Sequence, residues 1–520
     1  MNRDHSRARM AERQTPFDIV VIGGGATGAG IALDAASRNL DVLLLERDDF
    51  GTGTSSRSTK IIHGGVRYLA QGRIGLVREA LRERATLFQN APHLVSPLAF
   101  FVPIENTFQC AKYYAGLKLY DALAGKRGVN SCTWLGQDEF QSAAASVQTE
   151  KFSGAMRYFD GQFDDTRLLI NIVATAAESG AIVLNYAEVT SLNKDRRGRI
   201  KTVSFCDRES GSTHEVRTKA VVNASGVASD AVLRLDQPSR ATSILPSQGA
   251  HIVIDKAFLP NSDALLMPRT PDGRIMFAIP WLGHVLIGTT DTPLPAPVSI
   301  PVPKEEEIEM ILNVSANYLR RAPTARDILS SFAGIRPLVR VPTESKSSKV
   351  SREHRIDTLP SGLVSISGGK WTTYRIMAEQ CVDTVCKTHG LQVPKSQTRT
   401  LKLLSTPAPE ATPRRFEDYG TNARELEQLI ENDPGLDAPL CDDLPYKKAH
   451  CVWAIQNEMA RTIEDILARR TRALFLNARS ALQAAPAVLD ILTQELALEP
   501  QAAQQQLQSF TKLAIDYGCQ

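Results

Sequence analysis

One glycine cluster constrains this chain more than any other feature. Gly23, Gly25 and Gly28 follow the apolar, β-branched run Phe17–Ile22 and open a small-residue segment from about Ala26 to Arg38. The run predicts a buried strand and the segment a helix, so the glycines lie at a strand-to-helix turn. Glycines there permit a tight turn and let backbone N–H groups approach a pyrophosphate at the helix N-terminus.

The residues after this helix extend the pattern. Asp41 to Leu45 predicts a second strand, which ends in Glu46. The strand–helix–strand order implies a parallel sheet. A carboxylate at the end of the second strand can hydrogen-bond the adenosine ribose of a dinucleotide. A G-x-G-x-x-G motif alone is weak, but with strand, helix and acid in place it predicts a dinucleotide-binding unit.

The next loop bears on which dinucleotide is bound. An NAD enzyme usually continues with more strand–helix units, whereas residues 52–67 are rich in hydroxyl groups and glycine. Such a loop suits FAD, which has a ribityl chain and a flavin ring to hold; the alternative is a surface loop. The candidate FAD-binding residues here are Thr54, Ser55, Ser56, Thr59, Lys60, His63, Gly64 and Gly65.

Two distant segments supply further candidates. A strand running to Asn223 ends in a small-residue turn with Ala224 and Gly226. Residues 367–375 read as a strand end, two glycines and a helix capped by Thr372, whose N-terminal partial charge could stabilise a reduced flavin. The alternative is an ordinary helix cap. From this region we take Gly369, Trp371 and Thr372 as FAD-binding residues, together with Gly334 from the segment before it.

Arg336 and His251 are the candidate catalytic residues. Arg336 lies in an apolar turn flanked by Gly334 and Pro337. Arginine is rarely buried without a partner, and that partner is either a substrate oxygen or an internal carboxylate. His251 lies beside a predicted strand, where a histidine is more often a core residue than a catalyst.

Composition excludes several classes of protein. A chain of 520 residues suggests two to four domains. A net charge of +3 argues against a dedicated nucleic-acid binder. The eight cysteines include no C-x-x-C pair and no metal-ligand spacing, so no metal site is expected. No apolar run reaches the length of a membrane-spanning helix. Residues 1–15 carry no signal-peptide pattern and are predicted to be a disordered tail.

Several longer stretches resemble the FAD-dependent glycerol-3-phosphate dehydrogenases. The most specific are GTGTSSRSTKIIHGGVRYL from Gly51 and SGGKWTTYR from Ser367. Matching blocks include YFDGQFDD from Tyr158, SFAGIRPLV from Ser331 and ILARRTRALFLNA from Ile466. The resemblance spans roughly residues 16–480.

The resemblance implies a glutathione-reductase-like FAD-binding Rossmann fold with a β-rich substrate domain and a helical C-terminal cap. It implies an oxidoreductase domain at 16–395 and a cap at 396–520. Within the first, FAD-binding parts are expected at about 16–90, 160–240 and 330–390. Substrate-binding parts are expected at about 95–160 and 241–330.

The resemblance also implies the reaction. Oxidation of sn-glycerol 3-phosphate to dihydroxyacetone phosphate transfers a hydride to flavin N5, and the electrons pass to ubiquinone or menaquinone in a membrane. A phosphate substrate needs cations, so Arg67 and Lys370 are expected to bind it, with Tyr68 and Thr373 as donors. Arg336 would stabilise the reacting oxygen, and His251 would accept the proton.

Three alternatives share this fold or cofactor: an oxidase that passes electrons to O₂, an amine or amino-acid oxidase, and a non-catalytic FAD scaffold. A quinone-linked enzyme without a spanning helix implies peripheral binding, expected at the inner face of a cytoplasmic membrane with a mitochondrial location as the alternative. The stretch Tyr113–Leu119 is amphipathic and either docks on the membrane or is a core helix. The sequence leaves open whether the chain forms a homodimer.

Overall fold

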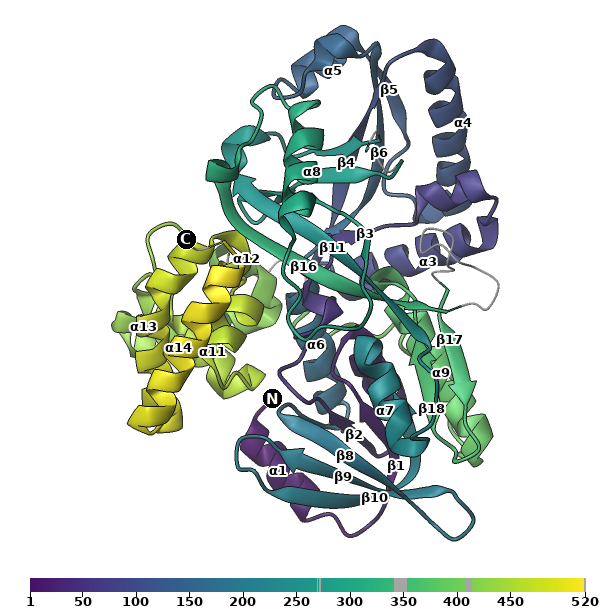
Figure 1. The fold of residues 1–520 in the computed structure, drawn as a ribbon, viewed down its shortest axis with the longest axis vertical. Helices are drawn as coiled ribbons and strands as arrows, with labels where there is room; N and C mark the ends of the chain where they lie inside the picture. Colours follow the sequence, from purple (N-terminus) through teal and green to yellow (C-terminus); the bar gives the residue numbers. More distant parts are fainter. Residues whose placement is uncertain (269, 271–272, 341–352, 407–413, 519–520) are drawn as a thin grey trace.

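The computed structural model describes residues 1–268, 270, 273–340, 353–406 and 414–518, without the side chains of residues 67, 70, 414 and 415. Figure 1 shows three regions: a sheet near the N-terminus, a second sheet with α4, α5 and α8, and a group of helices at one side that ends at the C-terminus.

The first sheet carries the dinucleotide-binding unit. β1 is parallel to both β2 and β10, and β10 is parallel to β18. The predicted strand, helix and second strand are therefore confirmed. In the described residues the strands are β17 (Arg355–Thr358), β18 (Val364–Ser367), β10 (Thr213–Asn223), β1 (Phe17–Ile22), β2 (Val42–Leu45) and β7 (Ile182–Leu184), with β8 (Ala187–Lys194) and β9 (Ile200–Asp207) continuing from β10.

Small residues let three helices pack closely on this sheet. α2 (Ala26–Ser37) contacts both α6 (Asp165–Glu178) and α9 (Tyr374–His389). A Cβ added at Gly30 would lie 2.8 Å from the Tyr374 ring, so only glycine allows this approach. Met377, Cys381 and Val385 form the buried stripe of α9, as their four-residue spacing predicted. The short α7 (Ser229–Asp236) follows β10.

The second sheet is mainly antiparallel. Its strands are β15 (Thr292–Pro293), β11 (Ile244–Asp255), β14 (His284–Gly288), β13 (Met276–Trp281), β12 (Ala264–Met267), β4 (Val95–Ile104), β6 (Gly154–Phe163) and β3 (Ile61–Ile62), with β16 (Ile328–Val339) beside β11 and β5 (Thr133–Gly136) beside β6. Its helices are α3 (Ile74–Asn90), α4 (Thr107–Ala124), α5 (Gln137–Ala143) and α8 (Glu305–Ala316).

The long β11–β16 pair brings the candidate catalytic residues together. Ser247 of β11 faces Arg336 of β16, and His251 faces Phe332. β3 and β16 belong to this second sheet, although both were assigned to FAD-binding parts of the chain. Which segment binds which ligand therefore stays a prediction.

The C-terminal region is mostly helical in residues 414–518, as predicted for a cap. Its longer helices enclose a core with Leu474 and Phe475, and this core is continuous with that of the second sheet. The helices are η10 (Arg414–Asn422), α10 (Ala423–Asn432), η11 (Pro434–Asp437), α11 (Lys448–Glu458), the π-helix η12 (Asp465–Arg470), α12 (Ala473–Leu476), α13 (Ala478–Leu496) and α14 (Pro500–Asp516).

The prediction of a disordered N-terminal tail was wrong. Residues Arg3–Ala11 form α1, which Asn2 caps through its side chain. Arg3 is buried and forms an ion pair with Asp207 at 3.0 Å. Met10 is buried in the same core as Phe17. The sequence near Arg3 gave no sign of its buried partner, because that partner, Asp207 on β9, lies about 200 residues away along the chain.

Candidate active site

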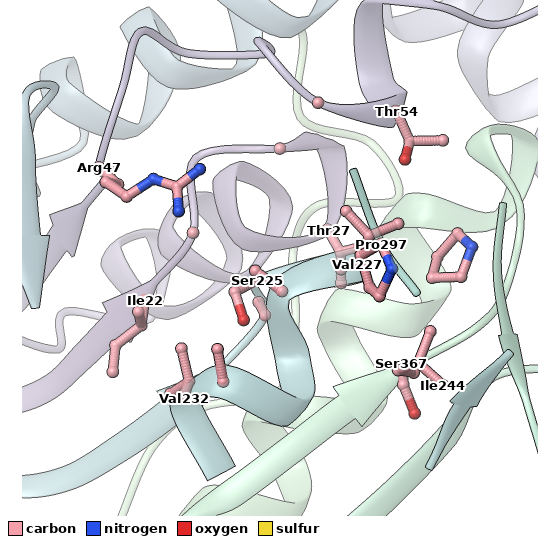
Figure 2. Close-up of a pocket in the computed structure, with 18 of the residues that line it drawn as sticks. Ile22, Thr27, Arg47, Thr54, Ser225, Val227, Val232, Ile244, Pro297 and Ser367 are labelled. Carbon is pink, nitrogen blue, oxygen red and sulfur yellow. The ribbon is translucent and has the colours of Figure 1, made fainter. Parts of the chain in front are cut away.

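A cavity of about 780 Å³ lies between the two sheets. The carboxyl ends of β1, β2 and β18 form one wall, through Ile22, Leu45 and Ile366. Pro246 of β11 and Pro337 of β16 contribute from the second sheet. Figure 2 shows the lining residues converging from these separate elements. Ligands bind at this edge in open parallel sheets.

The glycine turn forms the cavity's floor at the start of α2. Gly25 is the N-cap and offers no side chain to close the helix end, so the first N–H groups of α2 keep their positive end toward the cavity. Gly23 has a φ of +109°, and a Cβ there would lie 2.8 Å from the Ala224 carbonyl oxygen. A Cβ on Gly28 would lie 1.8 Å from the Gly23 oxygen. The turn therefore requires glycine at both positions.

Glu46 lies at the cavity edge, where β2 ends. Its carboxylate accepts hydrogen bonds from the backbone N–H of Gly24 at 2.6 Å and of Asp48 at 2.9 Å. Burial raises the pKa of this carboxyl group. These bonds fix the side chain against the glycine turn, in the place expected for contact with a ribose.

The hydroxyl-rich loop joins three distant segments at the cavity. Ser55 Oγ accepts a hydrogen bond from the Ala26 N–H at 3.0 Å, and its carbonyl accepts one from Trp371 Nε1 at 2.9 Å. Thr54 Oγ1 donates to the Ile335 carbonyl of β16 at 2.6 Å. The loop thus holds the N-terminus of α2, the second sheet and the 371 segment in one arrangement.

The predicted cofactor residues divide into two groups. The structure places one group in the cavity wall: Gly23, Gly25, Glu46, Thr54, Ser55, Ala224, Gly226, Gly369 and Trp371. In the described part of the chain, the others lie outside that wall: Gly28, Ser56, Thr59, Lys60, His63, Gly64, Gly65, Gly334 and Thr372. Several of these shape the wall indirectly, since a Cβ on Gly334 would lie 2.7 Å from the Arg57 carbonyl oxygen.

Thr372 does not cap α9, contrary to the prediction. Its hydroxyl accepts a hydrogen bond from the His63 N–H at 3.2 Å and lies 3.3 Å from the His63 carbonyl oxygen. The N-cap of α9 is Thr373, which makes no side-chain capping bond. Thr372 instead ties the 63–65 loop to the segment that lines the cavity.

Lys370 and Gly369 line both this cavity and a second one of about 270 Å³. The Lys370 ammonium lies 4.0 Å from the centre of the Tyr68 ring, so the structure brings these two predicted substrate residues together. Thr373 lines the second cavity. The side chain of Arg67 lies outside the described part of the structure, so its predicted phosphate contact stays a prediction.

Arg336 has an internal carboxylate partner, which was one of its two interpretations. Its guanidinium donates to Asp291 Oδ1 at 3.2 Å and to Thr289 Oγ1 at 3.1 Å. Asp291 also pairs with Arg274. Although Arg336 does not line the described cavity wall, its side chain is about 23% exposed. Its neighbour Pro337 does line the wall.

His251 is a buried residue of β11. Nε2 lies 3.0 Å from Thr59 Oγ1, and the ring stacks on Phe332 with centroids 4.9 Å apart. Burial, and then the charges of Lys60 and Arg336, lower the pKa of His251 well below its usual value. The imidazole is therefore neutral near pH 7. It lies behind the described cavity wall rather than in it.

Lys60, a predicted cofactor residue, faces the C-terminal cap rather than the described cavity wall. Its ammonium is fully buried and lies 2.6 Å from Asp165 Oδ2 and 2.7 Å from the Ser56 carbonyl oxygen. Arg472 of the cap donates to the same Ser56 oxygen at 2.7 Å. Burial lowers the pKa of Lys60 to about 7. Sequence gave no sign of this group, because Asp165 and Arg472 lie far from Lys60 along the chain.

The sequence interpretation also missed cavity residues. Residues 187–189, several residues of 227–235 and residues 295–299 line the cavity, and none of them was among the predicted site residues. The proline alternation in residues 293–303 was the one local signal for the last of them.

The glycine turn, the helix terminus and the acid at the end of β2 define an oxidoreductase of the FAD-binding class. A family model described as FAD dependent oxidoreductase matches residues 18–375. A second model, the C-terminal domain of alpha-glycerophosphate oxidase, matches residues 365–503.

The individual relatives are more specific. The human protein named glycerol-3-phosphate dehydrogenase, mitochondrial, is 39% identical over 535 residues, which cover 96% of this chain and 73% of that protein. The structure of the Bacillus halodurans glycerol-3-phosphate dehydrogenase with FAD is similar with a TM-score of 0.79 and 29% identity, covering 99% of this chain and 97% of that one. This chain belongs to the family of FAD-dependent glycerol-3-phosphate dehydrogenases.

More distant structures share the fold alone. The L-alpha-glycerophosphate oxidase of Mycoplasma pneumoniae has a TM-score of 0.57 and 16% identity, covering 75% of this chain and 99% of that chain. The predicted fold class, with its FAD-binding region, β-rich second sheet and helical cap, is confirmed.

The cavity residues fit FAD. Gly23 and Gly25 line the cavity without side chains in front of α2, whose N-terminus suits a pyrophosphate. Glu46 presents a carboxylate where a ribose is expected. At the other end, Lys370 and Trp371 enter from a segment remote in sequence. FAD is the cofactor that this class of enzyme requires.

Proposed function

We propose that this chain oxidises sn-glycerol 3-phosphate to dihydroxyacetone phosphate. The observation that carries the proposal is Lys370, a cation in the wall shared by the cofactor cavity and the second cavity. A phosphorylated substrate that reaches the cofactor from the second cavity would meet this ammonium. The names of the human and Bacillus halodurans relatives supply the substrate's identity.

Each polar side chain has a separate task in this proposal. FAD, when bound, supplies the acceptor for the two electrons and the hydrogen that leave C2. Lys370, with Tyr68 and Arg67, binds the phosphate and so orients C2. Arg336 stabilises negative charge on the C2 oxygen; as a guanidinium it stays protonated and is not the base. His251 is neutral at pH 7 and accepts the hydroxyl proton, with Thr59 holding its ring.

Anaerobic reduction of the yellow holoenzyme tests the substrate. Glycerol 3-phosphate should bleach the flavin's visible absorbance, whereas glycerol, which lacks the phosphate, should not. Lys370→Met should raise the KM for glycerol 3-phosphate by roughly 30-fold or more, as expected for removing one partner of a desolvated charge pair. Lys370→Arg should recover part of that loss. Equal reduction by both substrates would contradict the phosphate site.

We propose quinone in a membrane as the electron acceptor. Among the described residues, no helix has both the length and the apolar character needed to cross a bilayer, so contact would be peripheral. α4 offers a surface for it: Phe108, Tyr114 and Leu119 are exposed, with Phe108 at 78%. Lys112, Lys126 and Arg127 are exposed on or just after the same helix, which suits anionic headgroups.

The Tyr113–Leu119 stretch was interpreted either as a membrane-docking surface or as a core helix, and this arrangement combines the two. Leu117 is buried in the core, whereas Tyr114 and Leu119 are exposed. The inner face of a cytoplasmic membrane remains the proposed location. The mitochondrial name belongs to the human relative, and fractionation of the source cells separates the two locations.

Vesicle binding tests the membrane proposal. Leu119→Asp should reduce sedimentation of the holoenzyme with anionic vesicles. Ile515→Asp is the matched control, because Ile515 is a similarly exposed apolar residue on α14, in the cap. If the Leu119 and Ile515 variants bind vesicles equally well, α4 is not the docking surface.

Oxygen as the acceptor is the second candidate. The C-terminal domain model that matches residues 365–503 is named for an alpha-glycerophosphate oxidase, which favours this alternative. Stopped-flow reoxidation decides between them: the quinone proposal expects the reduced enzyme to react much faster with a soluble quinone than with O₂.

A further inference from the structure

A proline-rich segment crosses from the second sheet to the cofactor cavity. We call residues 294–303 the strap; with the flanking Pro293, they contain proline at positions 293, 295, 297, 301 and 303. The strap joins β15 to α8 without a helix or strand of its own. Prolines favour the extended polyproline conformation and remove N–H donors, so such a segment is stiff and does not join a sheet.

Both ends of the strap are fixed to β11. At the start, the Leu294 N–H donates to the Pro246 carbonyl at 2.9 Å. At the end, the Val302 carbonyl accepts a hydrogen bond from Gln248 Nε2 at 3.0 Å. Gln248 is in turn bound by Glu307, which also accepts from Thr290 and Thr292. The strap is therefore an ordered segment whose two ends are both hydrogen-bonded to β11.

The middle of the strap lines the cavity, and its end does not. Residues 295–299 are cavity-lining, and all five are exposed. Ile300 and Val302, which are exposed to a similar degree as Val298, are outside the described wall. Pro297 lines the same cavity as Val227, Thr27, Ser367 and Ile244, and Figure 2 draws these residues on one side of the view and Arg47 on the other.

The chemistry of this middle part suits a ring rather than a phosphate. Pro295 and Pro297 have no N–H, and Ala296 and Val298 have no polar side-chain atoms. Such a surface gives up water favourably when an apolar ring covers it. The glycine turn and Glu46 already account for the pyrophosphate and the adenosine, and in Figure 2 the strap lies away from Arg47, which follows Glu46.

We propose that the strap covers the flavin-bearing half of FAD and retains the cofactor in the enzyme. Residues 295–299 complete the cavity wall on the side where Pro246 and Pro337 of the second sheet contribute. With this wall in place, FAD leaves only when the strap lifts from the cavity or the cofactor slides past it. The stiffness given by the prolines makes both events slow. The inference concerns cofactor retention and does not depend on the identity of the substrate.

FAD release from the holoenzyme tests the proposal, because free FAD fluoresces more strongly than bound FAD. Val298→Asp should speed release about tenfold or more, since it places an unpaired charge against the ring system. Ile300→Asp is the matched control: it puts the same charge two residues further along, outside the cavity wall, and should release FAD at the wild-type rate within about twofold.

A second pair of variants separates stiffness from contact. Replacing Pro295 and Pro297 together by glycine should also speed release, with the side chain of Val298 intact. Equal release by wild type and Val298→Asp would overturn the proposal. So would equal acceleration by Val298→Asp and Ile300→Asp, which would indicate a general disturbance of the segment. Loss of binding to anionic vesicles in both Asp variants, with FAD release unchanged, would also overturn it and show that the strap docks on lipid.

Discussion

The cofactor cavity and the interface with the helical cap are built on opposite principles. The cavity is defined by side chains that are missing: Gly23 and Gly25 line it with backbone alone, and Gly28 lets the turn behind them close. The cap interface is filled with charged side chains. Asp49 has no exposed side-chain surface, and it binds Arg469 at 2.6 Å and Arg470 at 2.7 Å.

Further charges extend the cap interface. Arg167 binds Glu458 in a two-bond arrangement and also donates to the Arg470 carbonyl at 3.1 Å. Arg472 donates to Thr166 Oγ1 at 2.8 Å. A buried ion pair is weak evidence for stability, but removal of one partner leaves an uncompensated charge. The comparison shows that the glycine turn has no room for added side-chain atoms, whereas the cap interface depends on pairing each buried charge.

The largest expected effect is at the glycine turn. In Gly28→Val the Cβ would lie 1.8 Å from the Gly23 oxygen, so the turn must open and FAD binding should be lost. The flavin-to-protein absorbance ratio of the purified protein measures this. Gly116→Val on α4 is the control, since a Cβ there meets nothing within 4 Å. A fully flavinated Gly28→Val protein would show that the cofactor does not bind at this turn.

A substitution at His251 tests the place where the two regions meet. The His251 ring contacts Thr59 and stacks on Phe332. The ring of Phe332 in turn lies 4.7 Å, centre to centre, from that of Phe475 in the cap. His251→Asn should lower kcat/KM by roughly 10²–10⁴-fold with normal FAD content. The folded pKa of His251 is lowered, so the wild-type rate should hold below pH 6.5 and fall only well below it, as the imidazole gains a proton. The variant should lack this acidic limb; its persistence would place the base elsewhere.

Asp49→Asn tests the cap interface. It leaves Arg469 and Arg470 facing a neutral amide and should cost about 3–5 kcal/mol in the free energy of unfolding, measured in urea. Asp4→Asn is the control: Asp4 is 70% exposed beside Arg7, and its loss should cost under about 1 kcal/mol.

The same carboxylate gives a pH prediction. Its arginine partners lower the pKa of Asp49 to about 2, below its ordinary 3.8. The stabilisation is therefore complete above about pH 4 and is lost as pH falls toward 2. The difference in stability between wild type and Asp49→Asn should shrink over that range. A constant difference would show that the charge of Asp49 is not what holds the cap.

A second pH prediction concerns Lys60. Its folded pKa of about 7 lies below its ordinary 10.5, so above pH 7 the unfolded chain holds more protons on this residue. Stability should then rise with pH between about 7 and 10, by at most about 1.4 kcal/mol per pH unit. The slope should be smaller in Lys60→Met. Identical slopes would show that Lys60 stays charged and fully paired with Asp165.

Local pattern predicted the elements of the first sheet well. Phe17–Ile22, the helix from Ala26 and the strand before Glu46 form as expected, because each pattern is short and its physical cause is local. The cap's helical character was also predicted. The N-terminal helix α1 was not, because the partner that buries Arg3, Asp207 on β9, lies far away along the chain.

Candidate site residues divide in the same way. Residue type and spacing were enough for Gly23, Gly25, Glu46 and Lys370, which line the cavity as the motif and the resemblance indicated. They did not indicate the protein partners of Lys60 and Thr372, which are Asp165 and His63. A lysine or a hydroxyl in a donor-rich loop can face a ligand or the protein, and sequence does not show which neighbours compete for it.

The sequence by itself determined that this chain binds a dinucleotide on a parallel sheet, because only glycine fits the turn and its spacing is fixed by one strand and one helix. Tertiary structure alone decided where the charges lie. The pairing of Asp49 with Arg469 and Arg470 spans about 420 residues, and the strap reaches the cavity from the other sheet. Coulomb energy and burial depend on distances in space, and these distances cannot be read from the order of residues along the chain.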